Sequence, residues 1–194
     1  GIIIYAGTLF SFSLWYNIEN LFFSEAIFQS VKEFQLIIAC SLILFFVGVK
    51  DDIIGTAPVK KLFAHIVVAL ILVLMGDIRI TGLHGIFGIN EIPYWASVFL
   101  SIFTHVVVVN AFNLIDGVDG LAAGVGFIAS CVFGICFIFA NYYPYAALAF
   151  ALAGALGGFL IFNFSPAKIF MGDSGSLIIG MFISVIAFKL IEYP

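Results

Sequence analysis

Charged residues are scarce in this chain of 194 residues: only 9% are Asp, Glu, Lys or Arg, whereas 64% are hydrophobic. Soluble domains carry about 25% charged residues, and a core of this size could not hide so much apolar surface. We therefore predict that lipid is the solvent for most of the chain. The net charge of −4 leaves no basic patch that could neutralise a phosphate backbone, which argues against a nucleic-acid partner.

Cysteine and histidine are also few, with three of each. The cysteines lie inside apolar runs, so small buried side chains are a better interpretation than metal ligands or disulfides. The histidines show no metal-ligand spacing, and we expect them to be structural. These residues are Cys40, Cys131 and Cys136, and His65, His84 and His105.

The first residues lack the basic start and the small-residue cleavage site of a signal peptide. The chain begins with Gly1 and stops shortly after a long apolar run, at Pro194. From these two ends we expect a fragment of a larger membrane protein.

Long apolar runs are what the sequence has in abundance. A membrane-spanning helix needs about 20 mostly apolar residues, and tilt can make up the length of shorter runs. The candidate spans are 1–16, 34–50, 61–76, 95–112, 121–140, 145–162 and 175–192. The sequence therefore predicts an all-α, polytopic helical bundle in a membrane, with about seven spans in a single domain over 1–194.

The connectors between these runs differ in character. Residues 17–33 mix Phe with Glu, Asn and Lys, which fits an amphipathic surface segment or an ordinary loop equally well. Residues 77–94 alternate around several glycines and predict a short hairpin outside the bilayer. The segment NYYP at 141–144 predicts a tight aromatic turn.

The other three connectors, 51–60, 111–120 and 163–174, carry five aspartates. Counting membrane crossings puts all three on the same face. Four lysines on that face against three basic residues on the other make it cytoplasmic by the positive-inside rule. Charge so close to a bilayer is normally kept for function, so we predict a metal and phosphate site there. The five aspartates are Asp51, Asp52, Asp116, Asp119 and Asp173.

The pair Asp51 and Asp52 ends the second apolar run. Adjacent carboxylates repel each other, and a cation relieves that repulsion. Magnesium prefers one or two carboxylates together with water and substrate phosphates. A magnesium site and a solvated helix end are equally compatible with this pair taken alone.

The segment NAFNLIDGVDGLAAG is denser in polar groups. Asp116 and Asp119 are three residues apart and would share a face on a helical turn. Asn110 and Asn113 precede them at the same spacing, and the glycines free the backbone for close approach to a ligand. A ligand site explains this density better than Asp-Gly turn chemistry does.

The third segment, NFSPAKIFMGDSGSLIIG, places Asp173, Ser174 and Ser176 just before an apolar run. Such residues cap helices. A helix N-terminus also attracts anions, and Lys168 would add a positive charge. Phe170 is placed to stack on a base or sugar.

The motifs KDD, NLIDGVDGLAAG and PAKIFMGDSGSLIIG, in this order, resemble the polyprenyl-phosphate N-acetylhexosamine-1-phosphate transferases, most closely the bacterial N-acetylglucosamine-1-phosphate branch. The outer segment ITGLHGIFGINEIP resembles that family's periplasmic hairpin. Members transfer a sugar 1-phosphate from a UDP-sugar to a polyprenyl phosphate, undecaprenyl phosphate in bacteria, and release UMP. They use Mg²⁺, with Mn²⁺ as an alternative. This is the first membrane step of cell-envelope glycan synthesis.

The resemblance implies roles for individual residues. Asp173 and Asp116 are expected to bind the metal, and Asp51, Asp52, Lys61 and Asp116 to act in catalysis. The expected substrate-binding residues are Asn110, Asn113, Asp119, Lys168 and Phe170. His65 stands where the family usually has Gln, four residues after the lysine.

The resemblance also sets expectations for the whole molecule. We expect a multi-pass protein of the bacterial inner membrane with a cytoplasmic site, and a homodimer as its assembly. The family has helices before and after the matching segments, so we expect this fragment alone to be inactive. Three alternatives stay open: a relative that uses the muramoyl-pentapeptide nucleotide, an ion-coupled transporter, and a membrane scaffold without catalysis.

Overall fold

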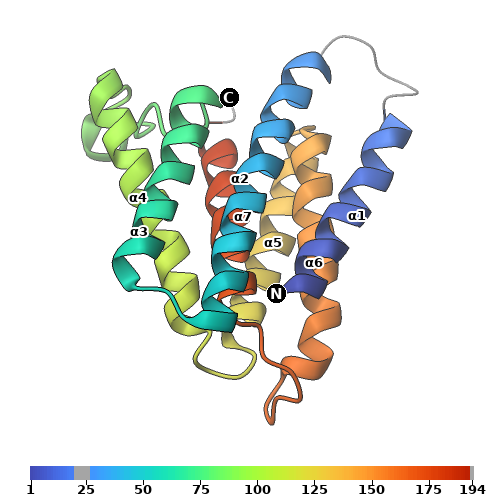
Figure 1. The fold of residues 1–194 in the computed structure, drawn as a ribbon. Coiled ribbons are helices and arrows are strands. Elements are labelled where there is room, and N and C mark those ends of the chain that lie inside the picture. The colour runs from blue at the N-terminus through green and yellow to red at the C-terminus, as the bar shows by residue number, and fades with distance from the viewer. Residues whose placement is uncertain (20–26, 193–194) are drawn as a thin grey trace.

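The computed structural model describes residues 1–19 and 27–192, and in that part of the chain it contains seven long helices and no named strand (Figure 1). A π-helical turn, η1 (Ile71–Met75), extends the third helix, and a 3₁₀ turn, η2 (Ile86–Gly88), lies in the loop that follows. The helices are α1 (Ile2–Glu19), α2 (Ile27–Ile54), α3 (Pro58–Leu70), α4 (Tyr94–Ile115), α5 (Leu121–Phe139), α6 (Tyr143–Asn163) and α7 (Asp173–Ile191).

Each predicted apolar run corresponds to one of these helices. Five segments in the described part of the chain are long and apolar enough to cross a membrane: α3 with η1, α4, α5, α6 and α7. Together with α1 and α2 they form the predicted all-α bundle of a polytopic membrane protein. Of the ambiguous connector 17–33, both ends are helical and residues 20–26 lie outside the described part.

The second helix is longer than its apolar run and continues to Ile54. Asp51 and Asp52 therefore lie at the end of this helix, as expected, but inside its last turn and not in the connector 51–60. Gly55 ends the helix in a left-handed conformation (φ 76°), with its N–H bonded to the carbonyl of Asp51 at 2.9 Å. The helical backbone thus fixes the direction of both carboxylates.

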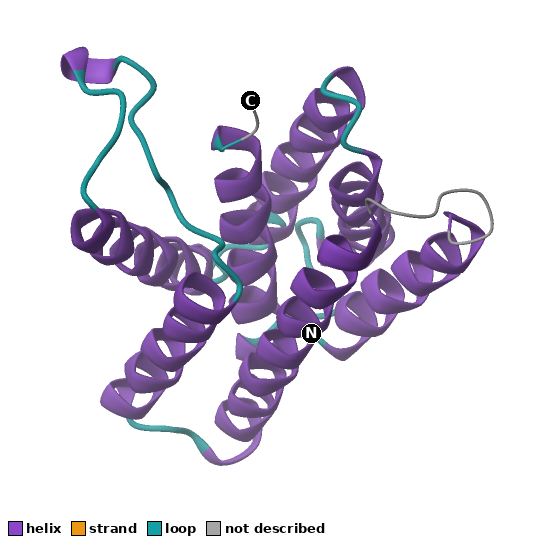
Figure 2. Ribbon diagram, turned by 90° about the horizontal axis from the view of Figure 1, so that it is seen from above, coloured by secondary structure: helices purple, strands orange, loops and turns teal. Residues whose placement is uncertain are grey.

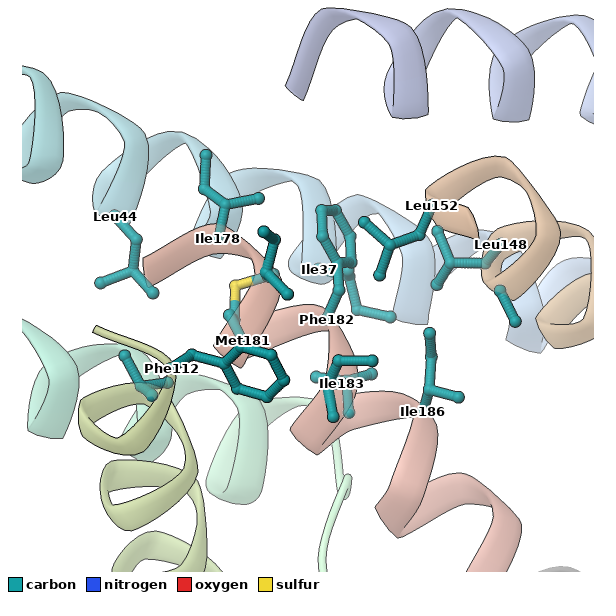
Figure 3. Packing of buried hydrophobic residues seen from close by; sticks show 14 of the residues in the cluster. Ile37, Leu44, Phe112, Leu148, Leu152, Ile178, Met181, Phe182, Ile183 and Ile186 are labelled. Atoms are coloured by element: carbon teal, nitrogen blue, oxygen red, sulfur yellow. The ribbon is translucent and has the colours of Figure 1, made fainter. Parts of the chain in front are cut away.

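The centre of the bundle is α7, which contacts α1, α2, α4, α5 and α6 (Figures 1 and 2). In its apolar stretch 78% of residues are buried, against 28–44% in the other four spanning segments. Lipid removes most of the hydrophobic driving force between helices, so close packing must hold them together. Figure 3 shows this packing: Ile178, Met181, Phe182, Ile183 and Ile186 of α7 lie against Ile37, Leu44, Phe112, Leu148 and Leu152.

Two glycines bring neighbouring helices unusually close to α7. A methyl group on Gly48 of α2 would lie 2.5 Å from the Cα of Ser174, and one on Gly180 would lie 2.7 Å from the Cα of Val109 in α4. Both distances are shorter than real contacts allow. The backbones of α2 and α4 therefore pack directly against α7. This contact places the acidic ends of α2 and α4 close to Asp173, the first residue of α7.

The outer connector, 77–94, forms a hairpin-like loop with a single antiparallel bridge between Gly82 and Glu91. It is tied to the far end of α7, because Glu192 accepts hydrogen bonds from the backbone N–H (2.7 Å) and the hydroxyl of Thr81. The predicted turn between the fifth and sixth runs is also present, with α6 beginning at Tyr143. The three acidic connectors lie at the opposite end of the bundle (Figure 1).

Candidate active site

Lys61 is the centre of the charged site. It lies in the first turn of α3, which begins at Pro58 after a short loop. Its Nζ donates to Oδ2 of Asp51 at 2.9 Å and to Oδ2 of Asp173 at 2.5 Å. One ammonium group therefore joins the end of α2 to the start of α7, two positions that are 122 residues apart in sequence.

Asp52 caps α7 from another helix. Its Oδ1 accepts a hydrogen bond from the N–H of Asp173 at 2.8 Å, and its Oδ2 accepts one from Ser174 at 3.2 Å. The residue at the cap position is Gly172, which has φ 71° and whose missing Cβ would lie 2.8 Å from Oδ1 of Asp52. A carboxylate here satisfies unpaired N–H groups and faces the positive end of the helix dipole.

The expected cap from Asp173, Ser174 or Ser176 is therefore wrong. Asp173 is the first helical residue, and no side chain next to it in sequence makes a capping hydrogen bond. Its carboxylate instead binds Lys61. The anion at this helix N-terminus is the protein's own Asp52.

Asp116 completes the acidic group from the end of α4. Burial is the main reason that the pKa of its carboxyl is raised to about 6, and the carboxylates of Asp173 and Asp52 act in the same direction, whereas the N-terminal ammonium of Gly1 and the backbone N–H of Gly172 oppose the rise. The electrostatic interaction of Asp116 with Asp173 and Asp52 places its carboxylate in the same site. Four carboxylates from α2, α4 and α7 thus lie at the start of α7, and two of them bind Lys61.

Asp119 has different neighbours from Asp116. Residues 116–120 form turns, not the helical turn that we expected. Oδ2 of Asp119 accepts a hydrogen bond from the N–H of Ala167 at 3.1 Å, which ties this connector to the next acidic one. Although only three residues separate them, Asp116 therefore belongs to the acidic site, whereas Asp119 makes a loop contact.

The two asparagines of α4 also differ. Asn113 donates to Oγ of Ser176 in α7 at 3.1 Å and so lies beside the site. Asn110 donates to the carbonyl of Val106 in its own helix at 2.7 Å. The structure brings Asn113 to α7, whereas the hydrogen bond of Asn110 stays within α4.

Phe170 and Lys168 lie on the loop before α7, and both are exposed. Phe170 is 77% exposed, which leaves its ring open to a planar partner. Lys168 makes no ion pair with the described residues, and its backbone N–H donates to the carbonyl of Phe162 at 2.8 Å. Their proposed roles toward a substrate stay predictions.

Sequence reasoning missed Asn163, a buried residue at the end of α6. Its Oδ1 accepts from the N–H of Gly120 at 3.1 Å, and its Nδ2 donates to the carbonyl of Ile169 at 2.9 Å. It thereby holds two acidic connectors together. The only signal in the sequence is a polar residue directly after the apolar run 145–162.

The fold and the site together define a class: a polytopic helical membrane protein with a carboxylate-rich site at one end of the bundle. Residues 34–191 match the model of glycosyl transferase family 4, and the chain belongs to that family. The match covers every residue of the acidic site described above, and it confirms the resemblance inferred from the motifs.

Relatives with named activities fall into two groups. Over 159 residues the chain is 36% identical to a decaprenyl-phosphate N-acetylglucosaminephosphotransferase of Mycobacterium tuberculosis (strain ATCC 25618 / H37Rv), covering 76% of this chain and 39% of the relative. Over 180 residues it is 36% identical to a phospho-N-acetylmuramoyl-pentapeptide-transferase of Streptococcus uberis, covering 88% of this chain and 53% of the relative. The chain thus spans about half or less of the relatives it matches.

Proposed function

We propose that this chain carries the acidic site of an enzyme that transfers an N-acetylhexosamine 1-phosphate from a UDP-sugar to undecaprenyl phosphate and releases UMP. N-acetylglucosamine 1-phosphate is the group that we expect to be transferred. One observation carries the proposal: Asp51, Asp52 and Asp116 come from remote segments to the start of α7 at Asp173, where Lys61 joins Asp51 to Asp173. The names of the relatives add the polyprenyl phosphate and the phosphosugar.

The chemistry requires two anions to meet, a nucleotide diphosphate from water and a phosphate held in lipid. An oxygen of the lipid phosphate attacks the phosphorus next to the sugar, and the bond from that phosphorus to the oxygen of UMP breaks. Catalysis of phosphoryl transfer is mainly positioning and charge stabilisation. A phosphate monoester is largely dianionic at pH 7, since its second pKa is about 6, so Asp51 and Asp52 orient the lipid phosphate and need not deprotonate it.

The donor set suits Mg²⁺, or Mn²⁺ in its place, because hard divalent ions prefer carboxylate oxygens. Asp173 and Asp116 are the residues that would hold the ion. When bound, the ion supplies charge stabilisation for the leaving UMP. Among residues 1–19 and 27–192, no three His, Cys, Asp or Glu side chains are already arranged to hold a metal. We therefore propose that substrate phosphates and water supply the remaining ligands.

The remaining site residues surround this centre. The exposed ring of Phe170 stacks on uracil, and Lys168 on the same loop offsets diphosphate charge. Asn113 holds Ser176 at the start of α7, while Asp119 orders the loop that carries Lys168 by binding Ala167. We place this end of the bundle at the cytoplasmic face of the bacterial plasma membrane, because most of the lysines lie there.

Replacing Asp173 by Asn in the full-length enzyme tests the proposal. Membranes carrying D173N, given radiolabelled UDP-N-acetylglucosamine, polyprenyl phosphate and Mg²⁺, should form labelled lipid at least about 100-fold more slowly than the parent. The control is D77N, because Asp77 lies on the outer hairpin, 77% exposed and paired with Arg79. Turnover of D173N near the parental rate would refute its role as a metal ligand.

A second donor nucleotide is supported by one comparison. The phospho-N-acetylmuramoyl-pentapeptide-transferase of Streptococcus uberis matches more of this chain than the mycobacterial relative does. Offering the muramoyl-pentapeptide nucleotide and UDP-N-acetylglucosamine separately to the same preparation distinguishes the two. The nucleotide that supports UMP release is the substrate.

An ion-coupled transporter is the rival from another class. Transporters place their ionisable residues near mid-membrane on broken helices. Here the four clustered carboxylates lie at helix ends, which favours the enzyme. Release of UMP that depends on polyprenyl phosphate would exclude transport as the only activity.

A further inference from the structure

The charges around Lys61 do not balance. Its ammonium contacts Asp51 and Asp173, while Asp52 and Asp116 lie in the same site and receive no ion pair from it. The three paired side chains are partly shielded from water, with exposures of 20% for Lys61, 15% for Asp51 and 22% for Asp173. Lys61 therefore pairs with two of the four carboxylates, and the N-terminal ammonium of Gly1 acts on the other two, Asp52 and Asp116.

The position of this ammonium conflicts with a metal at Asp173. Nζ of Lys61 lies 2.5 Å from Oδ2 of Asp173, within the space that a divalent ion bound to that oxygen would need. A divalent ion bound to this oxygen would be repelled by the ammonium, and that repulsion is strong in a partly desolvated site. An ion that takes Oδ2 of Asp173 as a ligand therefore competes with Lys61 for it.

The side chain of Lys61 is suited to such a movement. A lysine carries a compact charge on a flexible four-carbon stem, so it can change partners without a change in the backbone. Its second partner, Asp51, lies on a different helix from Asp173 and would remain available at 2.9 Å. The ammonium group can thus leave one carboxylate and keep the other.

We propose that Lys61 is a built-in counter-ion that occupies the cation position at Asp173 in the metal-free protein and gives up Asp173, while keeping Asp51, when a divalent ion binds. The inference rests on the proposed function, because it takes Asp173 as a metal ligand. Lys61 then lowers the affinity of the protein for the free ion. It also prevents unpaired carboxylates from repelling each other while the site is empty of metal.

Binding of Mn²⁺ to the full-length protein in detergent, without nucleotide, tests the competition. Removing the competing charge in K61M should tighten Mn²⁺ binding on the order of ten-fold, since one unit charge next to the ion is lost. Free Mn²⁺ is measured by electron paramagnetic resonance. The matched control is K60M, because Lys60 is the adjacent exposed lysine and makes no ion pair with the described residues. K60M should bind Mn²⁺ with parental affinity.

The displacement itself can be observed by amine acetylation followed by mass spectrometry. Adding Mn²⁺ to the parent should raise the acetylation rate of Lys61 several-fold, because its ammonium loses one of two partners, and should leave Lys60 unchanged. If K61M folds poorly, this measurement still decides the matter, because it uses only the parent protein.

The outcomes separate this inference from the proposed function. Mn²⁺ binding that is lost in D173N but is equally tight in K61M and the parent, with unchanged acetylation of Lys61, overturns the counter-ion alone. Absence of Mn²⁺ binding in the parent and in both lysine variants overturns the counter-ion, whereas the metal role of Asp173 is overturned by parental turnover of D173N. Tighter binding in K61M with faster acetylation of Lys61 supports the inference.

Discussion

At the scale of single residues, gathering carboxylates in one partly buried site lowers the free energy of unfolding. Asp116 shows this most directly, since burial, with a smaller contribution from the neighbouring Asp173 and Asp52, raises the pKa of its carboxyl to about 6. An ordinary Asp has a pKa near 3.9. The folded protein thus holds this proton more tightly than the unfolded chain does.

The sign of the resulting pH dependence follows by linkage. The stability that Asp116 contributes is fully present below its ordinary pKa and is lost as the pH rises to the folded-state value of about 6. Replacing Asp116 by Asn removes this loss. The Tm of D116N should therefore exceed the parental Tm by a margin that grows between pH 4 and pH 7, in detergent with EDTA.

The other titrating groups are shared by the parent and D116N, so the difference in Tm isolates the contribution of Asp116. A constant difference between pH 4 and pH 7 would show that folding does not raise the pKa of Asp116. Adding Mg²⁺ at pH 7 should shrink the margin, because the ion binds the parental carboxylate and stabilises the folded state.

At the scale of helices, close packing around α7 positions the site. The backbone contact between Gly180 and α4 leaves no room for a side chain, because a methyl group would lie 2.7 Å from the Cα of Val109. Backbone atoms cannot move aside as the tip of a flexible side chain can. The separation of α4 from α7 therefore depends on this glycine.

We expect G180A to destabilise the bundle by about 1–3 kcal/mol, the usual consequence of overpacking. Thermal unfolding in detergent measures it as a lower Tm. The matched control is G158A, because Gly158 is also helical and a methyl group there would meet nothing within 4 Å. G158A should be neutral or slightly stabilising, since Ala favours helix over Gly. Equal Tm values for G180A and the parent would mean that the two helices are further apart.

The sequence predicted the helices well, and the contacts between them poorly. Long apolar runs identify membrane spans by their length alone. Counting these spans along the chain then placed the five aspartates on one face of the membrane. The end of α2 could not be placed by hydropathy, because Asp51 and Asp52 are polar and yet helical. The capping of α7 by Asp52 was also out of reach, since the partners are 121 residues apart and nothing local marks them.

Resemblance supplied what local pattern could not at Lys61. A lysine near a membrane surface has many possible partners, and its spacing from Asp51 and Asp173 says nothing about contact. The family motif marked it as a site residue, and the fold then showed which carboxylates it joins. Asn163 lay outside the motifs quoted for the resemblance and was missed for that reason.

At the scale of the whole molecule, the acidic connectors and the outer hairpin lie at opposite ends of the bundle (Figure 1). Cysteine labelling in cells tests whether these ends face opposite compartments. Val118 and Phe164 are exposed residues of two acidic connectors. In a parent whose three native cysteines are replaced, V118C and F164C should resist a membrane-impermeant maleimide in intact spheroplasts. Both should react after permeabilisation.

I86C is the matched variant for this experiment, since Ile86 is an exposed residue of the outer hairpin. It should react with the maleimide in intact spheroplasts. Labelling of V118C together with I86C would contradict the topology, and labelling of V118C without I86C would invert it and move the site to the outer face.

The central helix is held at both ends: Asp52 accepts hydrogen bonds from its first residues, and Glu192, beyond its last, accepts one from the backbone N–H of Thr81. Its 19 residues measure about 28 Å at 1.5 Å per residue, close to the hydrocarbon thickness of a typical bilayer. The length of α7 therefore sets the distance of Asp173 from the opposite end of the bundle. When the thickness of the surrounding membrane varies, the bundle tilts or the lipids deform, and the acidic site keeps its distance from the outer hairpin.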